Sequence, residues 1–139
     1  MAVDEFWFHW NRGLGKWEKL GHPLDTLTVI LCFSWARFVP PRSGFLGYVL
    51  LSIFSCLFVT KDEWIHKREC TASEGWLHAL LFLVHSAMLI ALGSCYLQED
   101  HLDQIKSILS FQISLLIGFA LYQLLYWNSI STTRPLDDN

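Results

Sequence analysis

The amino-acid sequence predicts an all-α integral membrane protein whose four transmembrane helices form an antiparallel bundle. Hydrophobic residues make up 53% of the 139 residues and charged residues 17%, whereas about 25% of residues are charged in ordinary soluble domains. The apolar residues also gather in long runs separated by polar stretches, and a helix needs about 20 apolar residues to cross a bilayer. Because the length suits one domain, we expect a single membrane domain over residues 1–139.

The N-terminal segment, residues 1–22, is expected to be amphipathic and to lie in the membrane interface. Tryptophans alternate there with basic residues, and tryptophan is enriched where a bilayer meets water. The first span follows at about residues 24–39, which is short for a full crossing. Pro23 suits the first turn of this helix, because proline lacks the amide hydrogen that a first turn leaves unbonded.

Three further apolar runs complete the predicted bundle. They lie at about residues 43–60, 75–97 and 107–127. Pro40 and Pro41 end the first span, since proline cannot continue a hydrogen-bonded helix, and the short turn directs the second span back along the first. Gly44 and Gly47 would allow a close approach of these spans. The polar tail, residues 129–139, is expected to be disordered.

The distribution of basic residues predicts the orientation of the bundle. Four spans place both termini and the linker between the second and third spans on one side, which carries seven lysines and arginines against three on the other. The positive-inside rule therefore predicts cytoplasmic termini in a plasma or bacterial inner membrane. The net charge is −3 and no basic patch exceeds a pair of residues, which argues against nucleic acid as a partner.

The stretch 61–85 holds the strongest candidates for a functional site. If it is helical, its ionisable residues form two sets that each share one helix face. The sets are Glu63, His66 and Cys70, and Glu74, His78 and His85. Carboxylate, imidazole and thiolate groups are common metal ligands. The alternative for Glu63 and His66 is that they are ordinary loop residues, and the alternative for Glu74 is a capping box with Thr71.

His22 and Asp25 add two candidate ligands at the mouth of the first span. They lie three residues apart, and the predicted topology places them at the same membrane face as the stretch 61–85. The alternative for Asp25 is a structural role, because a carboxylate in the first turn of a helix is stabilised by the helix dipole.

His85 is the candidate that lies deepest in the predicted membrane. It comes seven residues after His78, and is therefore about 10 Å deeper at 1.5 Å per residue. An ionisable residue at that depth usually faces the bundle interior with a partner. Three interpretations stay open: a histidine bonded to a serine or to Gln112 or Gln123 of a neighbouring helix, a ligand or proton-handling group, and a lipid-facing side chain.

Together these residues suggest a metal site in a polar funnel that opens at the cytoplasmic interface. The predicted ligands are His22, Asp25, His66, Cys70, His78 and His85. Zinc, or less readily iron, would activate water there. Glu63 or Glu74 would act as the catalytic general base, and a lipid-like substrate would enter from the bilayer. This hypothesis makes the chain a membrane-embedded, metal-dependent enzyme.

Two other hypotheses compete with the enzyme. A haem site would need two imidazoles at similar depth, and His85 has no such companion in the spans. The chain could instead be a non-catalytic transporter unit or an accessory subunit, with residues 61–75 as a docking loop. Four spans are few for a transporter, so this alternative implies a homo-oligomer or a larger membrane complex.

Overall fold

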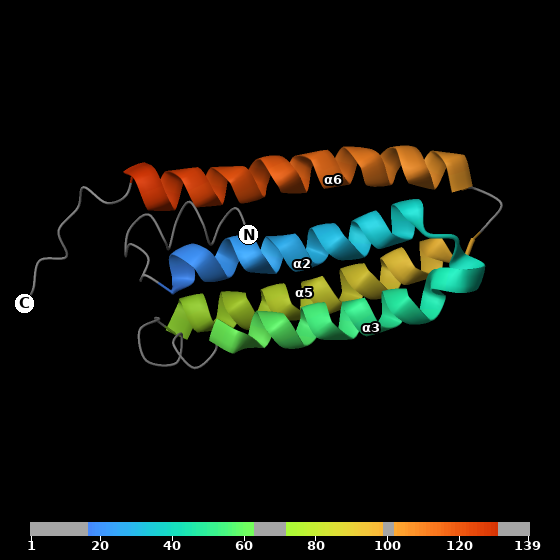
Figure 1. Cartoon of the computed structure of the whole chain (residues 1–139). Helices are drawn as coiled ribbons and strands as arrows, with labels where there is room; N and C mark the ends of the chain where they lie inside the picture. The colour runs from blue at the N-terminus through green and yellow to red at the C-terminus, as the bar shows by residue number, and fades with distance from the viewer. Residues whose placement is uncertain (1–16, 63–71, 99–101, 131–139) are drawn as a thin grey trace, which may run out of the picture.

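The computed structural model describes residues 17–62, 72–98 and 102–130, and within these residues it is almost entirely helical (Figure 1). The long helices are α2 (Glu18–Phe38), α3 (Pro41–Val59), α5 (Ala72–Tyr96) and α6 (Leu102–Leu125). The 3-10 turn η2 (Thr60–Asp62) follows α3, and the π-helical turn η4 (Tyr126–Ile130) follows α6. The all-α prediction is therefore confirmed for the described residues, among which no strand occurs.

Helix α2 begins before the predicted start of the first span. It starts at Glu18, so residues 18–22 are part of the same helix. The sequence had led us to expect Pro23 in the first turn of the helix. In the structure Pro23 lies inside the helix instead. The other end agrees with the prediction, because α2 ends at Phe38 and α3 begins at Pro41.

Three of the described helices are long and apolar enough to cross a membrane. They cover Pro41–Val59, Ala72–Tyr96 and Gln104–Ser129. Helix α2 has 21 residues, a rise of about 30 Å, so its length is sufficient. Its composition is too polar on average, because Glu18, Lys19, His22, Asp25 and Arg37 interrupt the apolar residues. The described residues thus contain four long helices, of which three rather than four have the expected apolar character.

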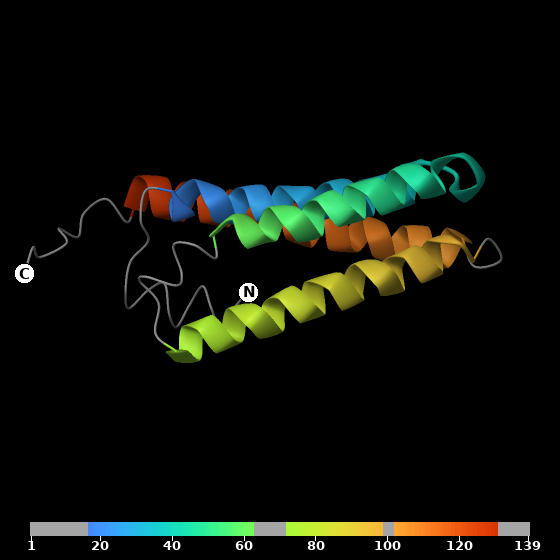
Figure 2. The ribbon, with the colours of Figure 1, turned by 90° about the horizontal axis from the view of Figure 1, so that it is seen from below.

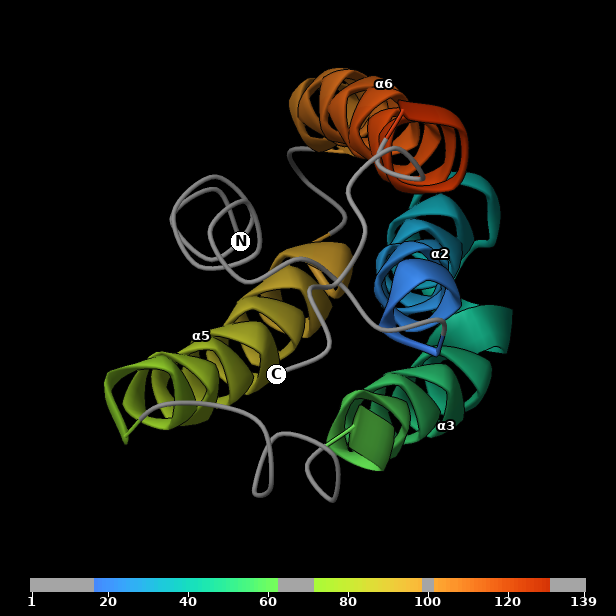
Figure 3. The same ribbon diagram turned by 90° about the vertical axis from the view of Figure 1, so that its left-hand side faces the viewer.

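Helix α2 lies at the centre of the arrangement. Seen along the long axis, it lies between α6 and α3, and α5 lies across from it (Figure 3). The chain reverses direction from each long helix to the next (Figure 1). The C-terminal end of α5 lies close to the other helices, whereas its first turns diverge from them (Figure 2). This divergence determines which predicted site residues can meet.

The apolar core forms around α2. This helix contributes Val29, Cys32, Phe33 and Ala36, all of which are buried. The other helices complete the core with Tyr48, Leu89, Leu92, Tyr96 and Leu109. Many large apolar side chains of α3, α5 and α6 point away from this core and are exposed.

The turn between α2 and α3 is held by aromatic side chains that bind backbone carbonyls. Trp35 Nε1 donates a hydrogen bond to the carbonyl of Gly44 at 2.9 Å. The Tyr96 hydroxyl donates to the carbonyl of Val39 at 2.8 Å. A Cβ atom at position 44 would lie 2.6 Å from the Tyr96 hydroxyl oxygen, so glycine permits this approach of α5 to the turn. The sequence led us to expect a close approach of the first two spans at Gly44, and the structure adds α5 to this approach through Tyr96.

A second glycine brings α3 and α5 together. The Tyr48 hydroxyl donates a hydrogen bond to the carbonyl of Leu89 at 2.6 Å. A Cβ atom at position 93 would lie 2.9 Å from Cε1 of Tyr48, so the ring occupies the space that a side chain would need. We call the region around both contacts the aromatic–glycine half. Its members are Trp35, Gly44, Tyr48, Gly93 and Tyr96.

Candidate functional site

Polar side chains of α2 face neighbouring helices in the half of the molecule where α2 begins. The Thr26 hydroxyl donates a hydrogen bond to Gln123 Oε1 of α6 at 3.0 Å, and both side chains are buried. Gln112, the other glutamine that was expected inside the bundle, is exposed on α6. The two glutamines of α6 therefore lie in different surroundings: Gln123 is buried beside Thr26, and Gln112 is exposed.

A hydrogen-bonded chain of three side chains joins α2, α3 and α5. Thr28 Oγ1 lies 2.8 Å from Ser55 Oγ, and Ser55 Oγ lies 3.1 Å from His85 Nε2. Thr28 Oγ1 also donates to the carbonyl oxygen of Asp25 at 2.8 Å. Thr28 and Ser55 are buried and His85 is half-buried. His85 is thus bonded to a serine of a neighbouring helix, as one of its three interpretations predicts.

The direction of this chain follows from the number of hydroxyl hydrogens. Thr28 gives its only hydroxyl hydrogen to the Asp25 carbonyl, which leaves its oxygen to accept from Ser55. Ser55 then gives its only hydroxyl hydrogen to Thr28, so its oxygen accepts from His85. His85 must therefore carry a hydrogen on Nε2. This assignment of the tautomer follows from the hydrogen-bond network, and it keeps Nε2 from acting as a metal ligand.

An ion pair joins α2 to the turn that follows α3. Lys61 Nζ lies 2.6 Å from Asp25 Oδ1, and the two side chains are only 15% and 13% exposed. The alternative role predicted for Asp25 is wrong, because α2 starts at Glu18 and Glu18 is the acidic residue of its first turn. Asp25 instead neutralises Lys61 two turns further along the helix.

We call these interhelical contacts the polar seam. Its members are Asp25, Thr26, Thr28, Ser55, Lys61, His85 and Gln123. Chemically, its groups satisfy one another in pairs or in a short chain. A hydrogen bond inside a folded protein contributes a net stabilisation of about 0.5–1.5 kcal/mol. The seam can therefore fix the relative positions of the four helices.

The described residues do not assemble the predicted metal site. Glu63, His66 and Cys70 lie outside the described residues, so the structure does not place them. The remaining candidates are His22, Asp25, Glu74, His78 and His85. In the part of the chain that the structure describes, no three histidine, cysteine, aspartate or glutamate residues lie close enough to hold one metal ion.

The geometry explains why the described candidates stay apart. Asp25 lies against Lys61, and His85 lies against Ser55. Glu74 and His78 lie in the first turns of α5, which diverge from α2 (Figures 2 and 3). Glu74 is the acidic residue in the first turn of α5, as predicted, and its side chain is 2% exposed. Its predicted capping partner, Thr71, lies outside the described residues.

Sequence reasoning missed the hydroxyl groups that build the seam. Thr26, Thr28 and Ser55 are ordinary residues for an apolar helix, and nothing in their spacing marks them as partners. Only the relative rotation of α2, α3 and α6 brings them to their acceptors. The one available indication was the placement of two threonines directly after Asp25 in the most polar of the long helices.

No protein-family model, curated protein or solved structure matches this chain.

Proposed function

We propose that the chain is an integral membrane protein whose four helices form an antiparallel transmembrane bundle, and that it acts as a non-catalytic helical subunit. The observation that carries this proposal is the distribution of side chains on α2. Its buried side chains include Thr26 and Thr28, whereas its outer face carries an apolar stripe. The stripe consists of Leu27, Leu31 and Phe38, which recur at the spacing of one helix face.

A water-soluble helix turns its polar face outward, whereas the outer face of α2 is apolar and its buried face holds two threonines beside the core residues. In a bilayer, polar side chains are costly unless they face the bundle interior and pair there. Helix α2 follows this rule at Thr26, which pairs with Gln123 of α6, and at Thr28, which lies against Ser55 of α3. We infer that α2 spans the membrane together with the three more apolar helices, although composition alone does not identify it.

The other helices support the same proposal through their outer faces. Leu46 of α3 and Ile90 of α5 are each 71% exposed, and Phe111 of α6 is 63% exposed. Large apolar surfaces of this kind mark contact with lipid or with partner proteins. The membrane would supply the lipid contacts, and a second copy or another membrane protein would supply the protein contacts.

The polar seam supports a structural role over a catalytic one. A catalytic site directs its polar groups toward a position that a substrate can occupy. In the seam, Lys61 is directed at Asp25, and His85 donates through Ser55 to Thr28. These groups hold helices together, and this is what an accessory subunit in a larger membrane assembly requires.

Two measurements test the proposal. Alkaline carbonate should leave the protein in the membrane pellet, and release into the supernatant would contradict a transmembrane bundle. Light scattering of the detergent-purified protein should then give the mass of an oligomer or of a complex with a partner. A monomer that turns over a lipid substrate would contradict the non-catalytic role while leaving the membrane placement intact.

The metal hypothesis stays a prediction, because Glu63, His66 and Cys70 lie outside the described residues. Elemental analysis of the purified protein, beside a His66→Ala/His78→Ala variant, tests it directly. Near one zinc or iron per chain, lost in the variant, would establish the metal site. A metal-free protein would leave the subunit proposal without this competitor.

A further inference from the structure

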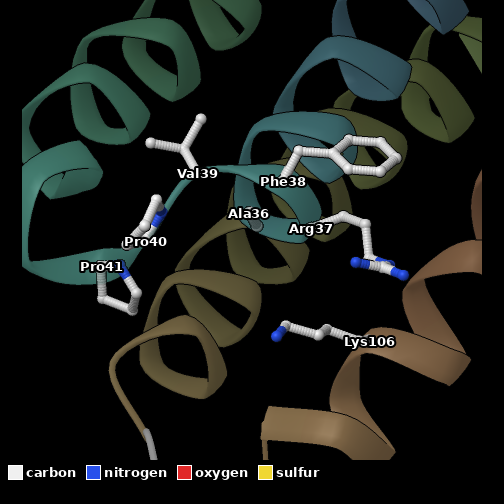
Figure 4. A pocket seen from close by; sticks show the side chains of 7 residues that line it. All are labelled: Ala36, Arg37, Phe38, Val39, Pro40, Pro41 and Lys106. Carbon is white, nitrogen blue, oxygen red and sulfur yellow. The ribbon is translucent and has the colours of Figure 1, made fainter.

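A pocket lies at the end of the molecule where α2 turns into α3. Its volume is about 210 Å³, and it is lined by residues 36–41 and by Lys106 of α6 (Figure 4). The turn contributes an apolar wall made by Phe38, Val39 and two prolines. Two basic side chains from different helices also line the pocket, Arg37 of α2 and Lys106 of α6 (Figure 4).

Arg37 is held in place without losing its charge. Its Nε donates a hydrogen bond to Ser110 Oγ of α6 at 3.0 Å, and its guanidinium carbon lies 5.1 Å from the centre of the Phe38 ring. Ser110 and Phe38 are neutral, so these contacts orient the guanidinium and leave its two terminal nitrogens for another acceptor. Within the described residues, no carboxylate forms an ion pair with Arg37 or Lys106.

Two cations that share one pocket repel each other unless an anion lies between them. Arginine is suited to this task because its planar fork matches the oxygens of a phosphate, and lysine adds a compact point charge. The pocket combines these cations with an apolar wall. A phospholipid is complementary to both, because its phosphate matches the cations and its hydrocarbon region matches the apolar wall. Basic pockets between membrane helices on the cytoplasmic or matrix side bind lipid headgroups. The orientation predicted from the basic residues places this pocket on the opposite side, so its lipid would come from the outer leaflet.

We propose that the pocket binds the phosphate group of an anionic phospholipid. The proposal rests on the transmembrane placement of the bundle, which brings the α2–α3 turn to the level of the headgroups. The two cations hold the phosphate, and the wall formed by Phe38 and the prolines contacts the first carbons of the lipid. Occupancy stabilises the pairing of α2 with α6, because Arg37 and Lys106 come from these two helices.

Native mass spectrometry of the delipidated full-length protein tests this assignment. The probes are phosphatidylglycerol, phosphatidylcholine with the same acyl chains, and inorganic phosphate. Arg37→Gln/Lys106→Gln should weaken phosphatidylglycerol binding roughly tenfold or more, since each cation near a membrane surface strengthens attraction to anionic lipid. Lys16→Gln/Lys19→Gln removes the same charge from the start of α2 and its preceding segment, and should leave the affinity unchanged.

Three outcomes would overturn the proposal. Equal binding of phosphatidylglycerol by the wild type and by Arg37→Gln/Lys106→Gln would show that these cations form no lipid site. Equal loss in the control variant would show a general effect of charge, and displacement of the lipid by an equal concentration of inorganic phosphate would show a site for the free anion. Arg37→Lys/Lys106→Arg keeps both charges and should retain binding, which separates the site from a folding defect. Carbonate extraction reports the membrane placement independently of all these outcomes.

Discussion

The two halves of the molecule join the same helices in different ways. In the half that contains the polar seam, side chains bond to side chains: Thr26 reaches Gln123, and Ser55 links Thr28 to His85. In the aromatic–glycine half, aromatic side chains bond to backbone carbonyls of another segment, as the Tyr48 hydroxyl does to Leu89. Backbones must approach closely for the second kind of bond, and glycine allows them to do so.

This difference accounts for the course of α5. The helix lies close to α3 near Gly93, where no side chain separates the Tyr48 ring from its backbone. It diverges toward its first turns (Figure 2), and His85 bridges to Ser55 across the wider part. Added volume should therefore be most harmful in the aromatic–glycine half, and lost polarity should be most harmful in the polar seam.

Gly93→Leu is the substitution with the largest expected effect. The first atom of the new side chain would meet Cε1 of Tyr48 at 2.9 Å, so the ring must move and its hydrogen bond to the Leu89 carbonyl must break. Overpacking of this kind lowers the free energy of unfolding by about 1–3 kcal/mol, and we expect the upper end of that range. Thermal unfolding in detergent, followed by near-ultraviolet circular dichroism, measures the loss.

Gly118→Leu is the matched control for this substitution. A Cβ atom at position 118 would have no atom within 4 Å outside its own helix among the described residues. We expect no loss of stability, and a small gain in helix propensity. Equal destabilisation by the two leucine substitutions would contradict the idea that the aromatic–glycine half is packed more closely than the surface around Gly118.

Lys61→Gln has the next largest expected effect. It removes the cation that lies 2.6 Å from the Asp25 carboxylate, whose side chain is 13% exposed. Exposed pairs contribute about 0–1 kcal/mol, whereas removing one member of a fully buried pair costs about 3–5 kcal/mol. The two side chains are 15% and 13% exposed, which lies between these two cases, so we expect a loss of about 1–2 kcal/mol in chemical unfolding. Asp25→Asn/Lys61→Gln should lose less than the sum of the single variants, and strict additivity would contradict the ion pair.

The sequence predicted the helices better than it predicted the site. Long apolar runs and the Pro40–Pro41 turn were enough to predict α3, α5 and α6, because length and hydropathy alone define an apolar helix. The start of α2 was placed too late. A proline suggested a first turn at Pro23, whereas the helix continues through it from Glu18.

The site was harder to predict because its residues meet only through packing. Shared faces along one helix can be read from spacing, and this identified Glu74, His78 and His85 as a set. The helix that each face contacts depends on the rotation of the helices about their axes and on their crossing angles. The spacing of residues in the sequence does not determine either quantity. His85 found Ser55 on α3, while His78 lies in the part of α5 that diverges from α3 (Figure 3). Residues that share one face of α5 thus lie in different surroundings.

Ser55→Ala has the smallest expected effect and bears most directly on the polar seam. It removes the middle of the chain between Thr28 and His85. We expect the free energy of unfolding to fall by about 1 kcal/mol, because a hydrogen bond inside a protein contributes about 0.5–1.5 kcal/mol and an unpaired buried donor or acceptor costs about 1–3 kcal/mol. Ser114→Ala is the control, because Ser114 bonds a carbonyl of its own helix on an exposed face.

The tautomer of His85 separates this explanation from a simple loss of packing. In the wild type, the Ser55 oxygen accepts from Nε2, so nitrogen-15 NMR of the neutral imidazole should show the hydrogen on Nε2. Ser55→Ala removes the acceptor that selects this form, and the signal should move toward a mixture of tautomers, whereas Ser55→Thr should preserve it. A wild-type imidazole with its hydrogen on Nδ1 would reverse the chain, since Ser55 would then donate to His85 and Thr28 would have to supply a hydrogen to Ser55 as well as to the Asp25 carbonyl.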